Sequence, residues 1–188
     1  MEFRIEDRDR AIAWAKSVVA DRRVVYLDTE TTGLDRTAEI IDIALVTNDG
    51  AVLFNTLVKP VRPIPAESSR IHGIFDDHVA IAPDWAEVAP WLDTVLQGHR
   101  VVVYNAEYDA GIVNAMCDRT GVRRMASGWE CAMLHYSAYA GEPGRYGGYK
   151  WHRLENVAAA FGIDPGGHRA LEDAVACRNV VAAMASST

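Results

Sequence analysis

The spacing of apolar and polar residues predicts one helix followed by three strands in the first third of the chain. Apolar residues recur at helical intervals over 11–18, which is typical of an amphipathic helix. Three runs of β-type residues follow, at 23–30, 39–47 and 51–58. The last two flank Asn48-Asp49-Gly50, a strong signal for a tight hairpin turn.

The rest of the chain reads mainly as helices. A proline-containing loop leads to a short helical turn at 66–70, and apolar spacing predicts a longer helix over 85–96. A fourth strand, short and almost wholly apolar, follows at 100–104. Further helical patterns then follow, at 107–119, 132–140, 154–161 and 170–184. A strand meander followed by alternating strand and helix predicts a mixed sheet covered by helices on both faces.

Length and composition narrow the class of protein. At about 150 residues per domain, the 188 residues predict one domain, and we assign 1–22 as a helical extension and 23–188 as that domain. The formal net charge of −7 argues against binding long duplexes through phosphate neutralisation alone. The three cysteines are far apart and lack a metal-type spacing, which fits a reducing compartment.

Two carboxylates end the first predicted strand. Side chains two apart on a strand project to the same side, so Asp28 and Glu30 should lie together after an apolar segment. Two unpaired anions would repel each other there, and a hard divalent cation such as Mg²⁺ or Mn²⁺ prefers such oxygen ligands. The motif indicates a metal site, with an ordinary solvated strand end as the alternative.

Two further groups of polar residues lie next to predicted elements. Asn105 and Asp109 follow the fourth strand, where Asn105 suits a helix cap and open α/β sheets bind ligands. His168 and Asp173 flank the start of the last helix, and they can converge only if His168 lies in the loop that Gly166 and Gly167 permit. Alone, Asp109 could merely complement the helix dipole and His168 could be a surface histidine. Their order along the chain favours one shared edge of the sheet.

These motifs resemble those of the DEDDh family of 3′-to-5′ exonucleases, the DnaQ-like group of the ribonuclease H-like superfamily. The matching motifs are Asp28-x-Glu30, Asn105-x-x-x-Asp109 and His168-x-x-x-x-Asp173. Ile71-His72-Gly73-Ile74 is similar to the family's intermediate substrate motif, and the likeness runs from about residue 24 to residue 184. The sister subgroup would have tyrosine where this chain has Arg169, so the histidine subgroup is the better match.

The resemblance implies a fold and a set of catalytic residues. The fold would be α/β, a ribonuclease H-like mixed five-stranded sheet made of a three-stranded antiparallel meander plus parallel strands, flanked by helices on both faces. Two Mg²⁺ or Mn²⁺ ions would lower the pKa of an attacking water and stabilise the departing 3′ oxygen. Their implied ligands are Asp28, Glu30, Asp109 and Asp173, with His168 as the general base that accepts the proton of that water.

The resemblance also implies residues on the substrate side. The backbone at Thr31 and the side chain of Glu30 would hold the terminal 3′ hydroxyl, and Leu34 would wedge beside the last base. The full implied substrate-binding set is Thr29, Thr31, Leu34, His72, Asn105 and Tyr108.

Basic and aromatic residues interleave on a glycine-rich stretch at 145–153, which we call the aromatic-basic segment. Such a segment could stack on bases and meet the phosphates of a single strand. It could equally be a solvated loop that Trp151 anchors to the core, because aromatic residues also dominate core packing.

The leading interpretation is a metal-dependent exonuclease that releases nucleoside 5′-monophosphates from the 3′ end of single-stranded nucleic acid. DNA is favoured over RNA, because Asp-Thr-Glu-Thr-Thr-Gly at 28–33 looks closer to proofreading-type members than to the oligoribonuclease type. Three alternatives stay open: an RNA-trimming exoribonuclease of the RNase T or oligoribonuclease type, a noncatalytic nucleic-acid-binding module of the same fold, and a small-nucleotide hydrolase.

The expected partners follow from this interpretation. They are the 3′ ends of single-stranded DNA or RNA and the nucleoside monophosphate product, with no membrane. A charged amino terminus and the lack of a long apolar run favour the cytoplasm. The chain ends soon after the last predicted helix, so we expect a free-standing enzyme, with polymerase association possible but not supported by a carboxyl-terminal tail.

Overall fold

Five strands form one mixed sheet in the order β3-β2-β1-β4-β5 in the computed structural model, which describes residues 5–35, 37–125 and 128–188. β1 pairs antiparallel with β2, and β2 pairs antiparallel with β3, whereas β4 and β5 run parallel to β1. The strands are β1 (Val24–Thr31), β2 (Ile40–Thr47), β3 (Val52–Leu57), β4 (Arg100–Val103) and β5 (Trp129–Cys131). The expected meander with added parallel strands is confirmed.

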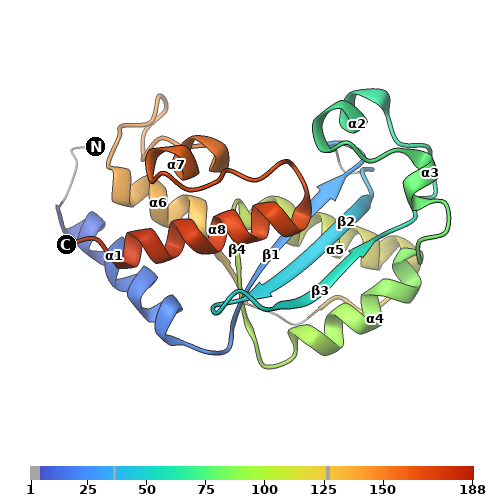
Figure 1. The fold of residues 1–188 in the computed structure, drawn as a ribbon, viewed down its shortest axis with the longest axis horizontal. Coiled ribbons are helices and arrows are strands. Elements are labelled where there is room, and N and C mark those ends of the chain that lie inside the picture. The colour runs from blue at the N-terminus through green and yellow to red at the C-terminus, as the bar shows by residue number, and fades with distance from the viewer. Residues whose placement is uncertain (1–4, 36, 126–127) are drawn as a thin grey trace.

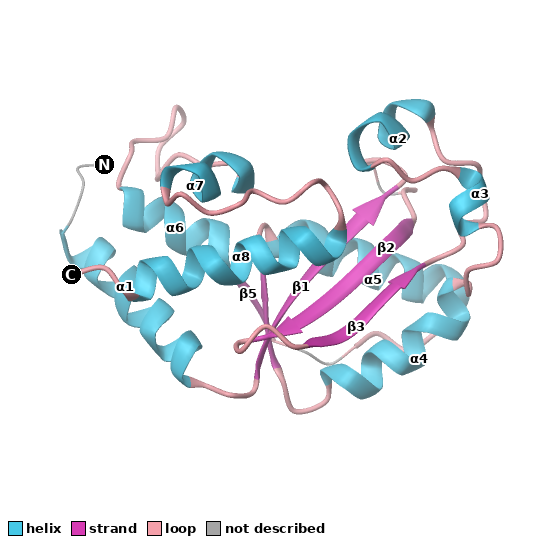
Figure 2. Cartoon of the chain, in the orientation of Figure 1, coloured by secondary structure: helices cyan, strands magenta, loops and turns pink. Residues whose placement is uncertain are grey.

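Helices cover both faces of this sheet (Figures 1 and 2). One core layer joins the sheet to α4 (Trp85–Leu96) and α5 (Ala106–Thr120). The other joins it to α1 (Ile5–Ala20), α6 (Ala132–Ala140), α7 (Leu154–Ala160) and α8 (Ala170–Ala185). Two short helices, α2 (Ala66–His72) and α3 (Asp76–Val79), complete the set and border a small separate cluster of apolar side chains.

Burial on both faces explains the composition of the central strands. Val25 and Leu27 of β1 pack toward α4 and α5, while Val24 and Tyr26 pack toward α1 and α8, and all four are fully buried. A strand covered on both faces must be apolar at every position, so it reads as a continuous run. The run ends only at Asp28, where the site begins.

Apart from the first helix, which begins at Ile5 rather than near residue 11, the predicted elements agree with the structure to within one or two residues. Two elements escaped prediction. β5 is only three residues long, too short to show alternation, and α3 is a single turn. The Asn48-Asp49-Gly50 turn joins β2 to β3 as expected, with Gly50 at φ 86°. That left-handed conformation explains the glycine.

The amino-terminal helix α1 packs on this same chain. Ala11, Ala15 and Val18 lie in the core shared with α8. Trp14 stacks on the ring of His135 with centroids 3.8 Å apart, and its Nε1 donates to Glu130 Oε2 at 2.7 Å. α1 therefore supports α6 and β5 from one side.

Among the described residues, none of the helices has the length and apolar content needed to cross a bilayer.

Candidate active site

The alternation of β1 sends its polar residues to two different layers. Asp28 and Glu30 project to the same face as Tyr26, toward α8, whereas Thr29 projects toward α5. The pairing with β2 places Asp42 directly opposite Glu30, so its side chain lies on the α8 face as well. Three carboxylates therefore reach this face from two neighbouring strands.

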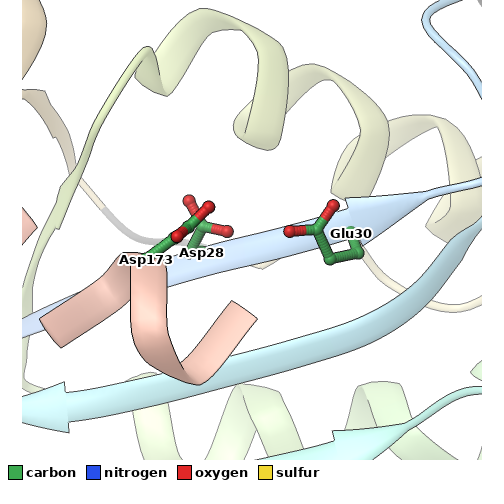
Figure 3. A group of neighbouring side chains, drawn as sticks. All are labelled: Asp28, Glu30 and Asp173. Atoms are coloured by element: carbon green, nitrogen blue, oxygen red, sulfur yellow. The ribbon is translucent and has the colours of Figure 1, made fainter. Parts of the chain in front are cut away.

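Asp28, Glu30 and Asp173 form a compact acid cluster. Asp173 lies in the first turn of α8, and one carboxylate oxygen from each of the three residues lies within 4.8 Å of the others. Figure 3 shows Asp28 beside Asp173, with the Glu30 carboxylate turned toward them from farther along β1. Residues far apart in the sequence thus converge at one point where β1 passes the start of α8.

Asp109 lies at the edge of this cluster rather than within it. It is only 3% exposed in the first turns of α5, and its Oδ1 accepts a hydrogen bond from Thr29 Oγ1 at 2.7 Å. Its charge nevertheless raises the pKa of Asp28, so the two carboxylates are electrostatic neighbours. The four predicted metal ligands therefore occur as three clustered side chains and a fourth beside them that is hydrogen-bonded to Thr29.

Burial raises the pKa of four carboxyl groups here, Asp28, Glu30, Asp109 and Asp173, and repulsion by neighbouring carboxylates adds to it for Asp28 and Glu30. Burial comes first for Asp28, followed by the charges of Asp109, Asp173 and Glu30. The same causes raise the pKa of Glu30 to about 8, and burial raises that of Asp109 to about 7 and that of Asp173 to about 6. Buried anions without a counter-charge are costly. Hard oxygen donors gathered in this way fit a divalent cation, whose charge would offset the repulsion.

His168 stands beside the cluster in an unusual backbone conformation. Its φ is 55°, and its Nδ1 lies 4.0 Å from Asp173 Oδ2 while half of the side chain is exposed. The preceding Gly166 is also left-handed, at φ +81°, and a Cβ there would overlap the Asp173 carboxylate. His168 therefore lies in the loop before α8, the only placement that lets it approach Asp173.

Sequence reasoning missed a buried ion pair next to this loop. Arg169 Nε donates to Asp42 Oδ2 at 2.8 Å, and Asp42 is 1% exposed. Asp42 Oδ1 and His72 Nε2 are buried and have no hydrogen-bond partner among the described residues. The signal was present in the sequence, because Asp42 is a charged residue inside the apolar run of β2.

The residues expected on the substrate side fall into two groups. Thr31 and Tyr108 form a hydrogen-bonded unit with the carbonyl of Gly33: the two hydroxyls lie 2.7 Å apart and lie 2.8 Å and 2.7 Å from the Gly33 oxygen. Each hydroxyl has one proton, so two of these three contacts are donated at a time. Leu34 is 88% exposed and, with Tyr108, lines a groove of about 740 Å³ along α5. Thr31 and Leu34, which follow Glu30 in the chain, therefore lie on the side that faces Tyr108 and α5.

Two of the residues expected on the substrate side are not fully exposed: His72 is buried and Asn105 is partly buried. His72 is buried, and its Nδ1 accepts from the backbone NH of Ile74 at 3.0 Å, which leaves Nε2 as the donor atom. Asn105 is the N-cap residue of α5, as expected, but its side chain makes no capping hydrogen bond. Its φ of 75° is left-handed, a conformation that asparagine tolerates better than most residues.

Comparisons with known proteins agree with this architecture. The RNase_T exonuclease family model matches residues 25–181. An uncharacterized exonuclease, CP81 of Escherichia phage 186, is 40% identical over 179 residues, covering 91% of this chain and 92% of its own. The epsilon subunit of DNA polymerase III from Treponema pallidum (strain Nichols) is 31% identical over 176 residues, covering 91% of this chain and 80% of its own.

A solved structure shares the fold. The nuclease domain of 3′hExo, a DEDDh family member bound to rAMP, superposes with a TM-score of 0.65 at 16% identity, covering 84% of this chain and 88% of that one. The family match leaves α1 outside its limits and includes every residue of the acid cluster. The chain therefore belongs to the RNase T exonuclease family, as a DEDDh-type exonuclease with a ribonuclease H-like fold.

Proposed function

We propose that this exonuclease removes nucleoside 5′-monophosphates from the 3′ end of single-stranded nucleic acid in a reaction that depends on divalent metal ions. The observation that carries the proposal is the meeting of Asp28, Glu30 and Asp173 within 4.8 Å, with His168 at their edge. A set of raised carboxyl pKa values in one place is typical of a site built for a cation or for catalysis.

Each side chain has a role in this proposal. Asp28, Glu30 and Asp173 would hold the ions, and Asp109, whose Oδ1 accepts a hydrogen bond from Thr29, would supply the fourth carboxylate. Two bound Mg²⁺ or Mn²⁺ ions would make the attacking water more acidic and stabilise the leaving 3′ oxygen. His168 accepts the proton of that water, and its half-exposed position lets it pass the proton on to solvent.

The substrate residues fit the terminal nucleotide. Thr31 and Tyr108 hold the loop at Gly33 in place through their shared hydrogen bonds. Leu34, which is exposed and lines the groove along α5, would wedge against the last base. His72, whose charged neighbours are Asp42, Arg169 and His168, would offer its Nε2 as a further donor.

DNA is the proposed substrate in preference to RNA. The support is the sequence of the first motif, Asp-Thr-Glu-Thr-Thr-Gly at 28–33, and the similarity to a DNA polymerase III epsilon subunit. A 2′ hydroxyl is recognised through details of groove shape. RNA is therefore the second substrate to test.

The test is digestion of strands labelled at either end. Single-stranded DNA, single-stranded RNA and duplex of one sequence are compared in Mg²⁺, in Mn²⁺ and in chelator. We expect mononucleotides to be released from the 3′ end, fastest with single-stranded DNA, and only with metal present. Asp28→Ala should abolish release, while Asp9→Asn, which changes an exposed carboxylate on α1, should retain it.

Other outcomes separate the alternatives. Strands left intact at both ends in the presence of either metal would refute the proposal. Tight strand binding without turnover would instead indicate a noncatalytic module, and hydrolysis of free nucleotides alone would indicate a nucleotide hydrolase.

A further inference from the structure

The aromatic-basic segment exposes two large rings. Tyr146 is 92% exposed and Trp151 is 61% exposed. The alternative in which Trp151 anchors the segment to the core is therefore wrong. Tyr149 anchors it instead: its side chain is partly buried, and its hydroxyl donates to Asp7 Oδ2 of α1 at 2.6 Å. The two exposed rings have no packing role that would explain them.

The backbone of the segment has a tight, specified shape. Gly144 N donates to the carbonyl of Gly148 at 3.0 Å, and a Cβ on Gly144 would come within 2.8 Å of Gly147 O. Gly147 and Gly148 adopt φ values of 95° and 68°, which favour glycine. The backbone NH of Lys150 donates to the carbonyl of Glu142 at 2.9 Å, and this hydrogen bond closes the turn. Tyr146 is thus displayed at a formed turn, which lowers the entropy lost when the ring is engaged.

The segment is attached to the edge of the sheet at which the active site lies. Tyr104, the residue after β4, donates from its hydroxyl to the carbonyl of His152 at 2.9 Å. β4 is the parallel neighbour of β1, so this bond fixes His152 beside the carboxyl ends of both strands. Trp151 and Arg153 flank His152, and α7 begins directly after them. Figure 1 shows α7 alongside α8, the helix that carries Asp173.

The charges of the segment suit a polyanion. It carries three cations, of which Lys150 pairs with Glu142 and Arg153 lies 3.5 Å from Glu155. Arg145 has no carboxylate partner among the described residues and lies over the Tyr146 ring, 5.5 Å from its centroid. The whole chain has a net charge of −7, so phosphate neutralisation alone would hold a strand weakly. Ring stacking supplies the attraction that charge does not, because every base has a flat face.

We infer that Tyr146 and Trp151 bind the single strand on the 5′ side of the terminal nucleotide, stacking on its bases while Arg145 and Arg153 meet its phosphates. This inference rests on the proposed function, because it places the strand that enters the acid cluster. It predicts a preference for longer strands, which a surface outside the cluster would supply.

The experiment measures kcat/KM for a 16-nucleotide strand and for a dinucleotide, which offers the segment at most one base beyond the terminal nucleotide. For Tyr146→Ala and for Trp151→Ala we expect the ratio of the two values to fall about tenfold, the effect of losing one stacked base. Phenylalanine at either position should restore most of the ratio, because it keeps a flat ring. Trp91→Ala is the matched control, since Trp91 is 58% exposed on α4 in the other helical layer and should leave the ratio as in the wild type.

The outcomes are distinguishable from failure of the proposed function. An unchanged ratio in both alanine variants would overturn the inference while leaving the exonuclease intact. If the wild type cleaves neither substrate, the proposed function fails. Fluorescence anisotropy of the labelled 16-nucleotide strand then decides the inference, which requires about tenfold weaker binding by each alanine variant and unchanged binding by Trp91→Ala.

Discussion

Arg169 Nε donates to Asp42 Oδ2 at 2.8 Å, which ties the residue after His168 to the strand next to β1. Asp42 is fully enclosed, whereas the Arg169 side chain is 45% exposed, so the arginine can retain partial hydration while it compensates a buried anion. The pair holds the loop before α8 against the sheet. It thereby sets the position of His168 relative to Asp173.

Replacing Arg169 should therefore affect both stability and catalysis. We expect Arg169→Met to lower the free energy of unfolding by about 1–3 kcal/mol, because it leaves the Asp42 carboxylate buried without its charged donor. We also expect a lower kcat, because the His168 loop loses its attachment. Chemical denaturation and steady-state kinetics measure the two effects.

A surface pair provides the control for Arg169. Arg124→Met breaks an ion pair with Asp118 in which both side chains are more than half exposed. Such pairs contribute about 0–1 kcal/mol. Equal destabilisation by the two variants would contradict the role given to the buried pair.

Asp28 should lower the stability of the metal-free protein although cleavage requires it. Asp28→Asn removes a buried charge from a repelling cluster, so we expect the metal-free protein to gain stability. A gain of about 1 kcal/mol would raise the Tm by roughly 2–4 °C for a chain of this length. The same variant should lose cleavage and the rise in Tm that Mn²⁺ gives the wild type. Thermal unfolding with and without Mn²⁺ measures this, and a lower Tm without metal would contradict the expected repulsion.

The metal-free protein should lose stability as the pH rises from 6.5 to 9. The pKa values of Asp109 and Glu30 are raised to about 7 and about 8, while unfolded carboxyl groups titrate near 4. Between these values the folded state binds more protons than the unfolded state, so stability falls as the pH passes through the folded pKa. Burial lowers the pKa of His72, so its contribution makes stability rise with pH. This contribution is confined to pH values below about 6.5, the ordinary pKa of histidine.

Unfolding in chelator across this range tests the pH prediction. Mn²⁺ should remove most of the decline, because a cation stabilises the ionised carboxylates. Glu30→Gln should also flatten the profile. A Tm that increases from pH 6.5 to 9 in chelator would have the wrong sign for a raised carboxyl pKa.

Gly166 should be needed for the position of Asp173 rather than for folding. A Cβ at Gly166 would overlap the Asp173 carboxylate, and moving that side chain removes one ligand from the cluster. We expect Gly166→Ala to weaken Mn²⁺ binding and to lower kcat/KM at least tenfold. Titration calorimetry with Mn²⁺ and strand digestion measure these effects.

Gly162 is a matched control for that substitution. It has a similar left-handed conformation, at φ +69°, but a Cβ there would meet nothing within 4 Å. Both alanine variants therefore have a similar backbone cost of about 1–2 kcal/mol. Equal loss of Mn²⁺ binding in Gly162→Ala would attribute the effect to the backbone and not to the overlap with Asp173.

Local patterns were sufficient to predict most elements of this fold, because its central strands are long and buried. The Ile40–Thr47 run and its hairpin partner could be located from apolar residues and a turn signal alone. β5 could not, because three residues do not establish a period. The position of Trp151 was equally unpredictable, since the sequence does not distinguish an aromatic anchor from an exposed ring.

The candidate site was predictable only where neighbours in sequence are neighbours in space. Asp28 and Glu30 share a face because they are two apart on one strand. Asp42 joins them through the pairing of β1 with β2, and β2 is buried at almost every position, so its sequence shows no alternation that would specify this register. The approach of His168 depended on a backbone torsion that two glycines permit but do not dictate. Such relationships arise at the tertiary level.

Because β1 presents Asp28 and Glu30 to α8 but Thr29 to α5, its two faces carry different chemistry. Inserting or deleting a single residue upstream in this strand would exchange hydroxyls for carboxylates on each face while keeping the strand equally apolar. Such a protein would still fold around an apolar core, but its carboxylates would no longer form a metal-binding cluster. The number of residues between α1 and Asp28 thus decides which face of the sheet the carboxylates reach, and the active site depends on it as much as on the acids themselves.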